Sequence, residues 1–280
     1  MSTETERVTL PAVAVPDHPG LVPQGTQFFG LYARELLRTF RNPWVIIITI
    51  VQPFMWLAFF GSSFGNVPLV ELEALVGTKI QSYVQFLLPG VLSTSMLTVG
   101  MFGSMSTIQD KRFGYMKRIL LTPTSKSTVY LAKALGSATR GLVQIPVMIG
   151  AALAFGVRFP GGALEWAGWL LVLVLLALGF SAMFLAVTAS STDWQTPGVI
   201  SNFITMPLMF ASAALFPTTN FPSWMQYIAK FNPVTYTAEF GRDFVLHGTA
   251  DWTYLGYVAI FAAAMLVIGT LTARKYLKVE

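Results

Sequence analysis

The sequence has 280 residues, of which 54% are hydrophobic and only 11% are charged, whereas soluble domains carry about 25% charged residues. This composition predicts a membrane protein. The net charge is +5, but the basic residues fall between apolar runs rather than on one solvated face, so nucleic acid is excluded as a partner. The chain has no cysteine and only two histidines, His18 and His247, which excludes a disulfide framework and a conventional Cys- or His-rich metal site.

Two segments precede the first long apolar run. Residues 1–24 contain four prolines and no apolar run of signal-peptide length, so we expect a flexible cytoplasmic tail. Residues 25–43 have helical periodicity, with apolar and basic side chains on opposite faces. The apolar face comprises Phe29, Tyr32, Leu36 and Phe40, and the basic face comprises Arg34, Arg38 and Arg41. We predict an amphipathic helix in the membrane surface, its arginines facing lipid headgroups or a partner; the alternative is a basic flank that only orients the first span.

Six segments are candidates for membrane spans, which need about 20 mostly apolar residues each. The expected spans are residues 44–64, 82–107, 132–157, 166–189, 197–216 and 252–273. The fifth of these is a little short and contains Pro207. The prolines inside spans favour kinks, and Pro146 is one of them. The sequence therefore predicts an all-α polytopic protein whose transmembrane domain covers residues 44–276.

The distribution of lysine and arginine predicts the orientation of these spans. If the N-terminus is cytoplasmic, thirteen of the 18 basic residues lie inside and four lie outside, as the positive-inside rule requires. We therefore expect a multi-pass protein of the plasma membrane with both termini in the cytoplasm. The remaining residue, Arg140, lies within the third span, and we expect its side chain to extend toward the cytoplasmic surface.

Residues 109–131 form the expected cytoplasmic loop between the second and third spans, and it reads "QDKRFGYMKRILLTPTSKSTVYL". Its apolar residues recur at helical spacing beside two basic residues, Lys117 and Arg118, and Pro123 ends the pattern. The apolar positions are Phe113, Met116, Ile119 and Leu120. We predict a short helix whose exposed apolar stripe contacts a partner. The alternative is a stripe that rests on the bilayer surface.

Residues 217–250, on the outer side, are too many for a simple connection and too apolar for a solvated loop. Asn232 followed by Pro233 is typical of an N-cap with proline in the first helical position. We predict a re-entrant hairpin of two short helices in the outer leaflet, with the apolar residues of its first half partly buried. The spacing of Glu239 and Arg242 allows an ion pair at the outer mouth.

Two motifs resemble those of the type-2 ABC exporter permeases. In the cytoplasmic loop the matching residues are Gly114, Leu120, Leu121, Thr122, Pro123 and Ser125. Before the last span the matching residues are Pro222, Trp224, Asn232, Pro233, Thr235, Tyr236 and Arg242. Lys117 reverses the charge of the glutamate that the family usually has there. The sequence is more similar to the daunorubicin-type drug-export branch than to the polysaccharide branch.

The resemblance implies a six-span permease that exports an amphipathic substrate, such as a drug, a lipid or a lipid-linked glycan. It further implies a separate cytoplasmic ATPase in two copies and a second permease copy, most simply an identical one. The cytoplasmic loop would be the coupling helix on the ATPase, through Phe113, Gly114, Met116, Lys117, Arg118, Leu120, Leu121 and Pro123. The outer hairpin would be a gate formed by Trp224, Asn232, Pro233, Tyr236, Glu239 and Arg242.

The chain has no G-x-x-x-x-G-K-[ST] motif, so we expect no cofactor in it and no ATPase activity of its own; ATP and magnesium would bind the partner. The alternative function is a stand-alone ion-coupled transporter, which usually needs ionisable groups near the midplane of the membrane. Polar span residues are candidates for the substrate pathway, although each has a structural alternative. These candidates are Gln85, Ser95, Thr98, Asn202 and Thr205.

Overall fold

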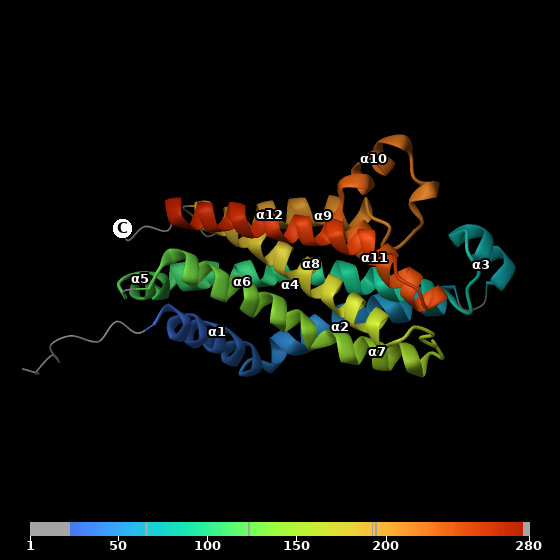
Figure 1. Cartoon of the computed structure of the whole chain (residues 1–280), viewed down its shortest axis with the longest axis horizontal. Coiled ribbons are helices and arrows are strands. Elements are labelled where there is room, and N and C mark those ends of the chain that lie inside the picture. Colours follow the sequence, from blue (N-terminus) through green and yellow to red (C-terminus); the bar gives the residue numbers. More distant parts are fainter. Residues whose placement is uncertain (1–22, 65–66, 123, 192, 194, 277–280) are drawn as a thin grey trace, which may run out of the picture.

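A computed structural model describes residues 23–64, 67–122, 124–191, 193 and 195–276, and these contain no strand. The helices pack into one elongated bundle (Figure 1). They are α1 (Gln24–Phe40), α2 (Pro43–Ser63), α3 (Leu69–Val76), α4 (Tyr83–Arg112), α5 (Tyr115–Leu120), α6 (Lys126–Leu142), α7 (Gln144–Ala154), α8 (Ala163–Ser190), α9 (Thr196–Phe210), α10 (Ser223–Phe231), α11 (Pro233–Arg242) and α12 (Trp252–Tyr276), with short 3-10 and π turns at Thr218–Asn220 and Asp243–His247. The expected tail lies almost wholly outside the described residues.

Five helical segments of the described chain are long and apolar enough to cross a membrane: α2, α4, α6 with α7, α8 and α12. The third is broken between Leu142 and Gln144. Pro146 explains the break, because a proline ring clashes with the carbonyl four residues earlier, here that of Leu142. The helix is therefore interrupted beside this proline, whereas α2, α4 and α9 continue through Pro53, Pro89 and Pro207, where kinks were also expected.

The predicted span at 197–216 differs from the observed helix. α9 has 15 residues and ends at Phe210, which gives a length of about 22 Å against a hydrocarbon thickness of about 30 Å. Residues 211–217 continue without regular helix, although Ala211 to Leu215 are buried. The described residues thus combine five helical segments that are long enough to span a membrane with one short helix and a buried irregular segment. At the start of α9, Asp193 accepts hydrogen bonds from Thr196, which lower the pKa of its carboxyl group.

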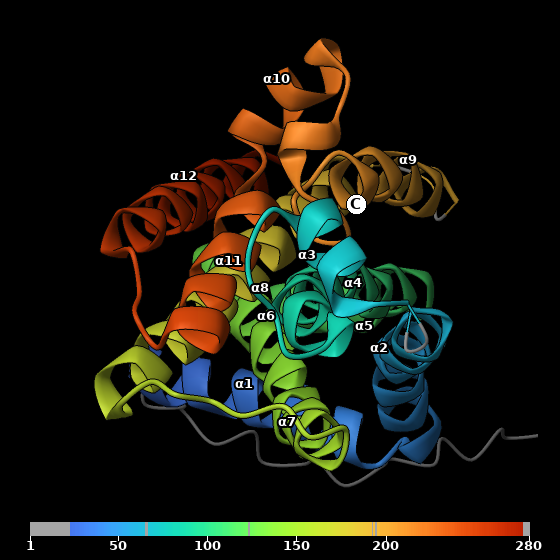
Figure 2. The ribbon, with the colours of Figure 1, turned by 90° about the vertical axis from the view of Figure 1, so that its right-hand side faces the viewer.

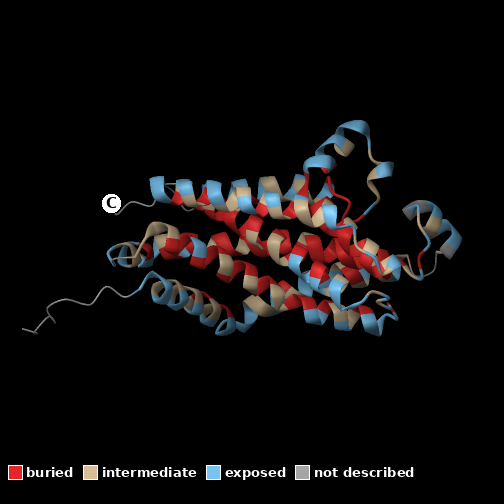
Figure 3. Ribbon diagram, viewed as in Figure 1, coloured by how far each residue is buried: buried red, intermediate tan, exposed pale blue. Residues whose placement is uncertain are grey.

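The centre of the bundle is formed by α4 and α8, which are buried along most of their length (Figure 3). Viewed from one end, α2, α6, α11 and α12 surround them (Figure 2). Gly100 permits the close contact of α4 with α8, because a Cβ atom there would lie 2.8 Å from the backbone of Phe180. By contrast α2 and α12 are mostly exposed and apolar, as expected of helices that face lipid or another protein.

The two ends of the bundle differ. The start of α1, the helix α5 and the last turn of α12 lie at one end, and α3 and α10 lie at the other (Figure 1). The segments that the basic residues assign to the cytoplasm therefore share one end of the molecule. The short helix α3, at the opposite end, was not predicted.

Candidate functional site

The expected coupling segment is a short helix of 6 residues, α5, that follows the C-terminal end of α4. Gly114 allows the sharp turn between them, because it has a φ of 71°, in the left-handed region that other residues rarely adopt. The exposed apolar side chains around α5 are those of Phe113, Tyr115 and Leu121, with exposed fractions of 70%, 50% and 73%. This end of the molecule therefore presents an apolar contact surface, flanked by the exposed Lys117 and Arg118.

One part of the expected stripe was wrong. Met116 is only 4% exposed and packs against Val129, Tyr130 and Leu185 in a small core of the same chain. Ile119 and Leu120 are partly buried against the same core. The reason is that α5 folds back onto α6 and α8, so the inward face of this short helix is used by the chain itself. Pro123 lies outside the described residues.

A cluster of five charged side chains, here called the charge cluster, lies behind α5. Its members are Arg34, Glu35, Arg38, Asp110 and Lys133. The Lys133 ammonium group donates to Glu35 at 2.9 Å and to Asp110 at 2.5 Å, and all three side chains are buried. Asp110 also accepts from Arg38 at 2.8 Å. The cluster joins α1, α4 and α6 immediately before the chain enters α5.

These contacts determine which face of α1 points inward. Glu35 and Thr39 are buried, Arg34 and Arg38 pair with Asp110, and Phe29, Leu37 and Phe40 are exposed. The predicted amphipathic helix is present, and Arg34 and Arg38 pair with a buried carboxylate of the same chain while 32% and 35% of their side chains stay exposed. The physical reason is the buried Asp110, which offers these arginines a carboxylate in a medium of low dielectric constant. Arg41 alone of the three predicted arginines is exposed.

A further basic residue fixes the end of α8. The Lys111 ammonium group donates to the carbonyls of Thr188, Ala189 and Ser191, at 2.6, 3.2 and 3.1 Å. These are terminal carbonyls that a helix leaves without internal partners, and a cation is favoured at that position by the helix dipole. Lys111 thereby attaches the end of α4 to the end of α8.

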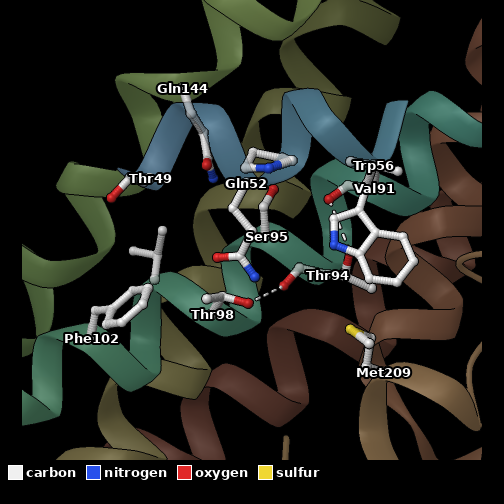
Figure 4. A pocket seen from close by; sticks show the side chains of 12 residues that line it. Thr49, Gln52, Trp56, Val91, Thr94, Ser95, Thr98, Phe102, Gln144 and Met209 are labelled. Atoms are coloured by element: carbon white, nitrogen blue, oxygen red, sulfur yellow. Dashed lines mark hydrogen bonds between the residues drawn. The ribbon is translucent and has the colours of Figure 1, made fainter. Parts of the chain in front are cut away.

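A polar cavity, here called the α2–α4 cavity, lies within the membrane-spanning region. Figure 4 shows the side chains of Gln52, Ser95, Thr98 and Gln144 directed into it from α2, α4 and α7. Its interior volume of about 20 Å³ is room for about one water molecule. Gln144 is completely buried, and its Oε1 atom has no hydrogen-bond partner in the described chain. This amide is therefore available to a polar group that enters the cavity.

The predicted pathway residues separate into two groups. Ser95 and Thr98 line the α2–α4 cavity. Gln85 instead donates to the Val245 carbonyl at 3.1 Å and is a structural bridge. Asn202 is exposed on α9, and Thr205 donates to the Ser201 carbonyl at 2.7 Å. The structure thus brings two of the five together.

The outer element is organised by Asn232, which is the N-cap of α11 with Pro233 in the first helical position, as predicted. Its Oδ1 accepts from the Val234 amide at 3.0 Å, and its Nδ2 donates to the carbonyls of Leu208 and Ala211 at 2.7 and 2.9 Å. One amide therefore starts α11 and satisfies the carbonyls at the end of α9. This is why the irregular backbone after α9 is tolerated in an apolar environment.

The first half of the predicted hairpin is more exposed than expected. Trp224, Tyr227 and Phe231 of α10 are exposed, and Figure 2 shows α10 projecting away from the bundle. No other segment of the described chain covers these apolar side chains of α10. By contrast α11 packs on α4, α8 and α12, so the two helices differ in burial.

A broad outer pocket lies between α10 and α11. Glu239, Arg242 and Asp243 line it together with Tyr236 and Tyr254. The predicted Glu239–Arg242 ion pair is confirmed at 3.1 Å, and Arg242 is buried. Burial, and secondarily the charge of Glu239, raise the pKa of the Asp243 carboxyl group. The ring of Tyr236 stacks on that of Tyr257, 4.7 Å away.

The sequence analysis missed the charge cluster. Helical periodicity and the count of basic residues assign no role to Glu35, Asp110 or Lys133. A signal was nevertheless present, because Glu35 and Asp110 are acidic residues in two segments otherwise dominated by arginine and lysine. The backbone partners of Arg242, the carbonyls of Phe86 and Ala214, were not predicted either, since backbone carbonyls carry no sequence signature.

Comparison with known proteins identifies the family. The ABC-2 type transporter family matches residues 26–245. A putative transport permease, ycf38, of Cyanophora paradoxa is 27% identical over 81% of this chain and 76% of its own. The daunorubicin resistance ABC transporter permease protein DrrB1 of Streptomyces coeruleorubidus is 26% identical over 84% and 80%. The inner membrane transport permease YadH of Escherichia coli K12 is 25% identical over 85% and 91%.

The matched region covers α1, α5, the α2–α4 cavity and the Asn232–Arg242 element together. The chain therefore belongs to the ABC-2 type transporter family and is a multi-pass transport permease.

Proposed function

We propose that this chain is the membrane subunit of an exporter of the plasma membrane, driven by ATP hydrolysis in a separate cytoplasmic ATPase. The observation that carries the proposal is the apolar surface of α5, where Phe113, Tyr115 and Leu121 are exposed at the end that holds the basic residues. Three large apolar side chains exposed together on one short connection suit a docking surface for a partner, and contact with the bilayer surface is the alternative.

The rigid connection behind α5 supports a role in transmitting motion. The charge cluster and Lys111 attach the end of α4 to α1, α6 and α8. Displacement of α5 by the ATPase would therefore move several spans together rather than bend one loop. The α2–α4 cavity would then contact the polar part of an amphipathic substrate, through neutral amide and hydroxyl groups.

We further propose that two copies pair through the side that carries α2 and α9, each with one ATPase subunit. The cavity is lined by Thr49, Gln52 and Trp56 of α2 and by Met209 of α9. Both helices expose large apolar side chains, among them Phe54 and Phe203. A partner on this side would cover them and enclose the cavity. The daunorubicin resistance named for DrrB1 suggests an amphipathic drug as the first substrate to test.

The test is co-purification of the chain with a co-expressed candidate ABC ATPase, followed by ATPase and transport assays in proteoliposomes. We expect a complex with two copies of each chain, ATPase activity that rises with candidate drugs, and transport that needs ATP. Transport driven by a proton or sodium gradient without ATP would contradict the proposal and favour the ion-coupled alternative.

A further inference from the structure

Arg140 is a buried cation without an acidic partner. Its side chain is only 8% exposed, within the third membrane span. In the described chain its one hydrogen bond is from Nε to the Thr39 hydroxyl, at 3.0 Å, and no carboxylate forms an ion pair with it. Its two terminal nitrogens therefore have no protein acceptor. A charge in this situation is costly unless a ligand compensates it.

The neighbouring charges increase the imbalance. The charge cluster contains three basic side chains and two carboxylates, and all its carboxylates are already paired. Arg140 is a fourth cation beside it, linked to α1 through Thr39. The local excess is therefore two positive charges, held mostly out of water.

The side chains of Arg38 and Arg140 both line one pocket, here called the arginine pocket, between α1, α2, α4 and α6. Its volume is about 230 Å³. Arg38, Arg140 and the polar side chains of Asn42, Ser106 and Gln109 form one part of the wall. The other part is apolar and consists of Val45, Ile48, Phe102 and Met105. The pocket thus combines a cationic end with an apolar side.

The position of this pocket indicates what could reach it. It lies where α2 enters the bundle, and it shares Thr49 and Phe102 with the α2–α4 cavity. Ile48 on its wall is exposed on the surface of α2, as is Ile47 beside it. A molecule in the leaflet next to α2 could therefore place a polar head against the arginines and leave its chains along α2.

We infer that the arginine pocket binds the phosphate group of an anionic lipid from the cytoplasmic leaflet. Guanidinium groups bind phosphate oxygens in a bidentate manner, and basic pockets between spans on the cytoplasmic side suit such headgroups. The Arg140 Nη atoms supply the unused donors, and the apolar wall receives the acyl chain. A bound lipid there would join α1 to α2 and α6. The site stands whether or not the chain couples to an ATPase.

The test is lipid binding by the purified full chain, measured by native mass spectrometry after delipidation. The probes are dioleoyl-phosphatidylglycerol and dioleoyl-phosphatidylcholine at equal concentration. We expect the wild type to retain phosphatidylglycerol about tenfold better, because both headgroups offer a phosphate but the choline of phosphatidylcholine places a further cation beside the local excess of positive charge. Arg140→Gln should remove this preference, and Arg140→Lys should keep part of it. Arg158→Gln, an exposed residue of the opposite end, is the matched control and should behave as wild type.

A second measurement detects misfolded variants and distinguishes binding of the lipid from binding of free inorganic phosphate. Thermal midpoints in phosphatidylcholine alone should be similar for wild type and Arg140→Gln, whereas added phosphatidylglycerol should raise only the wild-type midpoint. Inorganic phosphate should not reproduce that rise. Equal preference in wild type and Arg140→Gln, an equal loss in Arg158→Gln, or full replacement of the lipid by inorganic phosphate would each overturn the inference.

Discussion

Arg242 donates a hydrogen bond from Nη2 to the backbone carbonyl of Ala214 at 3.0 Å, which joins α11 to the irregular segment after α9. The same guanidinium donates to the Phe86 carbonyl of α4 at 3.3 Å and lies 3.8 Å from the centre of the Phe86 ring. Gly90 of α4 is in contact with Ala214, where a Cβ atom would overlap the Ala214 carbonyl oxygen. Arg242 is therefore a buried cross-link between three segments rather than a surface residue of an outer loop.

Replacement of Arg242 by methionine should destabilise the protein. It leaves the buried Ala214 carbonyl without its donor, at about 1 to 3 kcal/mol, and removes the added contact to the Phe86 carbonyl inside α4. Glu239→Gln should cost much less, because Glu239 is one-third exposed and its salt bridge is screened by solvent. Thermal midpoints in detergent provide the comparison. Similar losses for the two variants would show that the ion pair, and not the backbone contacts, carries the effect.

Asn232 has two separable roles, and two substitutions distinguish them. Asn232→Asp keeps an oxygen that caps Val234 but loses the donor to Leu208 and Ala211, and Asn232→Ala loses both. Loss of an N-cap typically costs about 1 kcal/mol. If the bridge to α9 dominates, aspartate should be as harmful as alanine or worse, because it also brings a charge next to carbonyl oxygens. Wild-type stability of the Asn232→Asp variant would show that Asn232 acts only as the N-cap of α11 and that its bonds to α9 add no stability.

The predictable parts of this fold are those that local pattern determines. Long apolar runs fix the spans, Pro146 fixes the break in the third, and Asn232 with Pro233 fixes the start of α11. The end of α9 could not be predicted, because it depends on donors from Asn232 and Arg242, which are distant in sequence from Leu208 and Ala214. The inward direction of Met116 and the pairing of the α1 arginines with Asp110 likewise depend on tertiary partners, which helical periodicity alone does not identify.

Lys133 should be the most sensitive member of the charge cluster. Lys133→Met leaves Glu35 buried without its ion-pair partner and removes one partner of Asp110, so a strong loss of stability is expected. Adding Glu35→Gln to Lys133→Met should recover part of this loss, with a coupling energy of about 0.5 to 3 kcal/mol. Lys275→Met, an exposed residue at the same end, serves as the control. Strict additivity of the two substitutions in thermal unfolding would contradict a direct buried ion pair.

The contact with the ATPase should depend on the exposed side chains around α5. Phe113→Ser and Leu121→Ser together should leave the thermal midpoint almost unchanged and abolish co-purification, because both side chains lie outside the core. Met116→Ser should instead lower the thermal midpoint, since Met116 is buried within the chain. Phe231 is as exposed as Phe113 but lies at the opposite end of the bundle. The control variant Phe231→Ser should therefore still co-purify with the ATPase. Normal co-purification of the double variant would remove α5 from the proposed interface.

Thiol labelling can test whether the outer element moves during transport. The chain has no native cysteine, so single cysteines at Tyr227 and Val234 report only their own positions. Tyr227 is exposed on α10, whereas Val234 is completely buried at the start of α11. A membrane-impermeant reagent should therefore label Tyr227→Cys quickly and Val234→Cys slowly in the resting protein. If α11 opens the pathway, ATP in the complete complex should accelerate labelling at Val234→Cys, and an ATPase-inactive partner should prevent this. Labelling at Val234→Cys that stays slow in every nucleotide state, while export proceeds, would mean that α11 is a fixed wall of the pathway and not its gate.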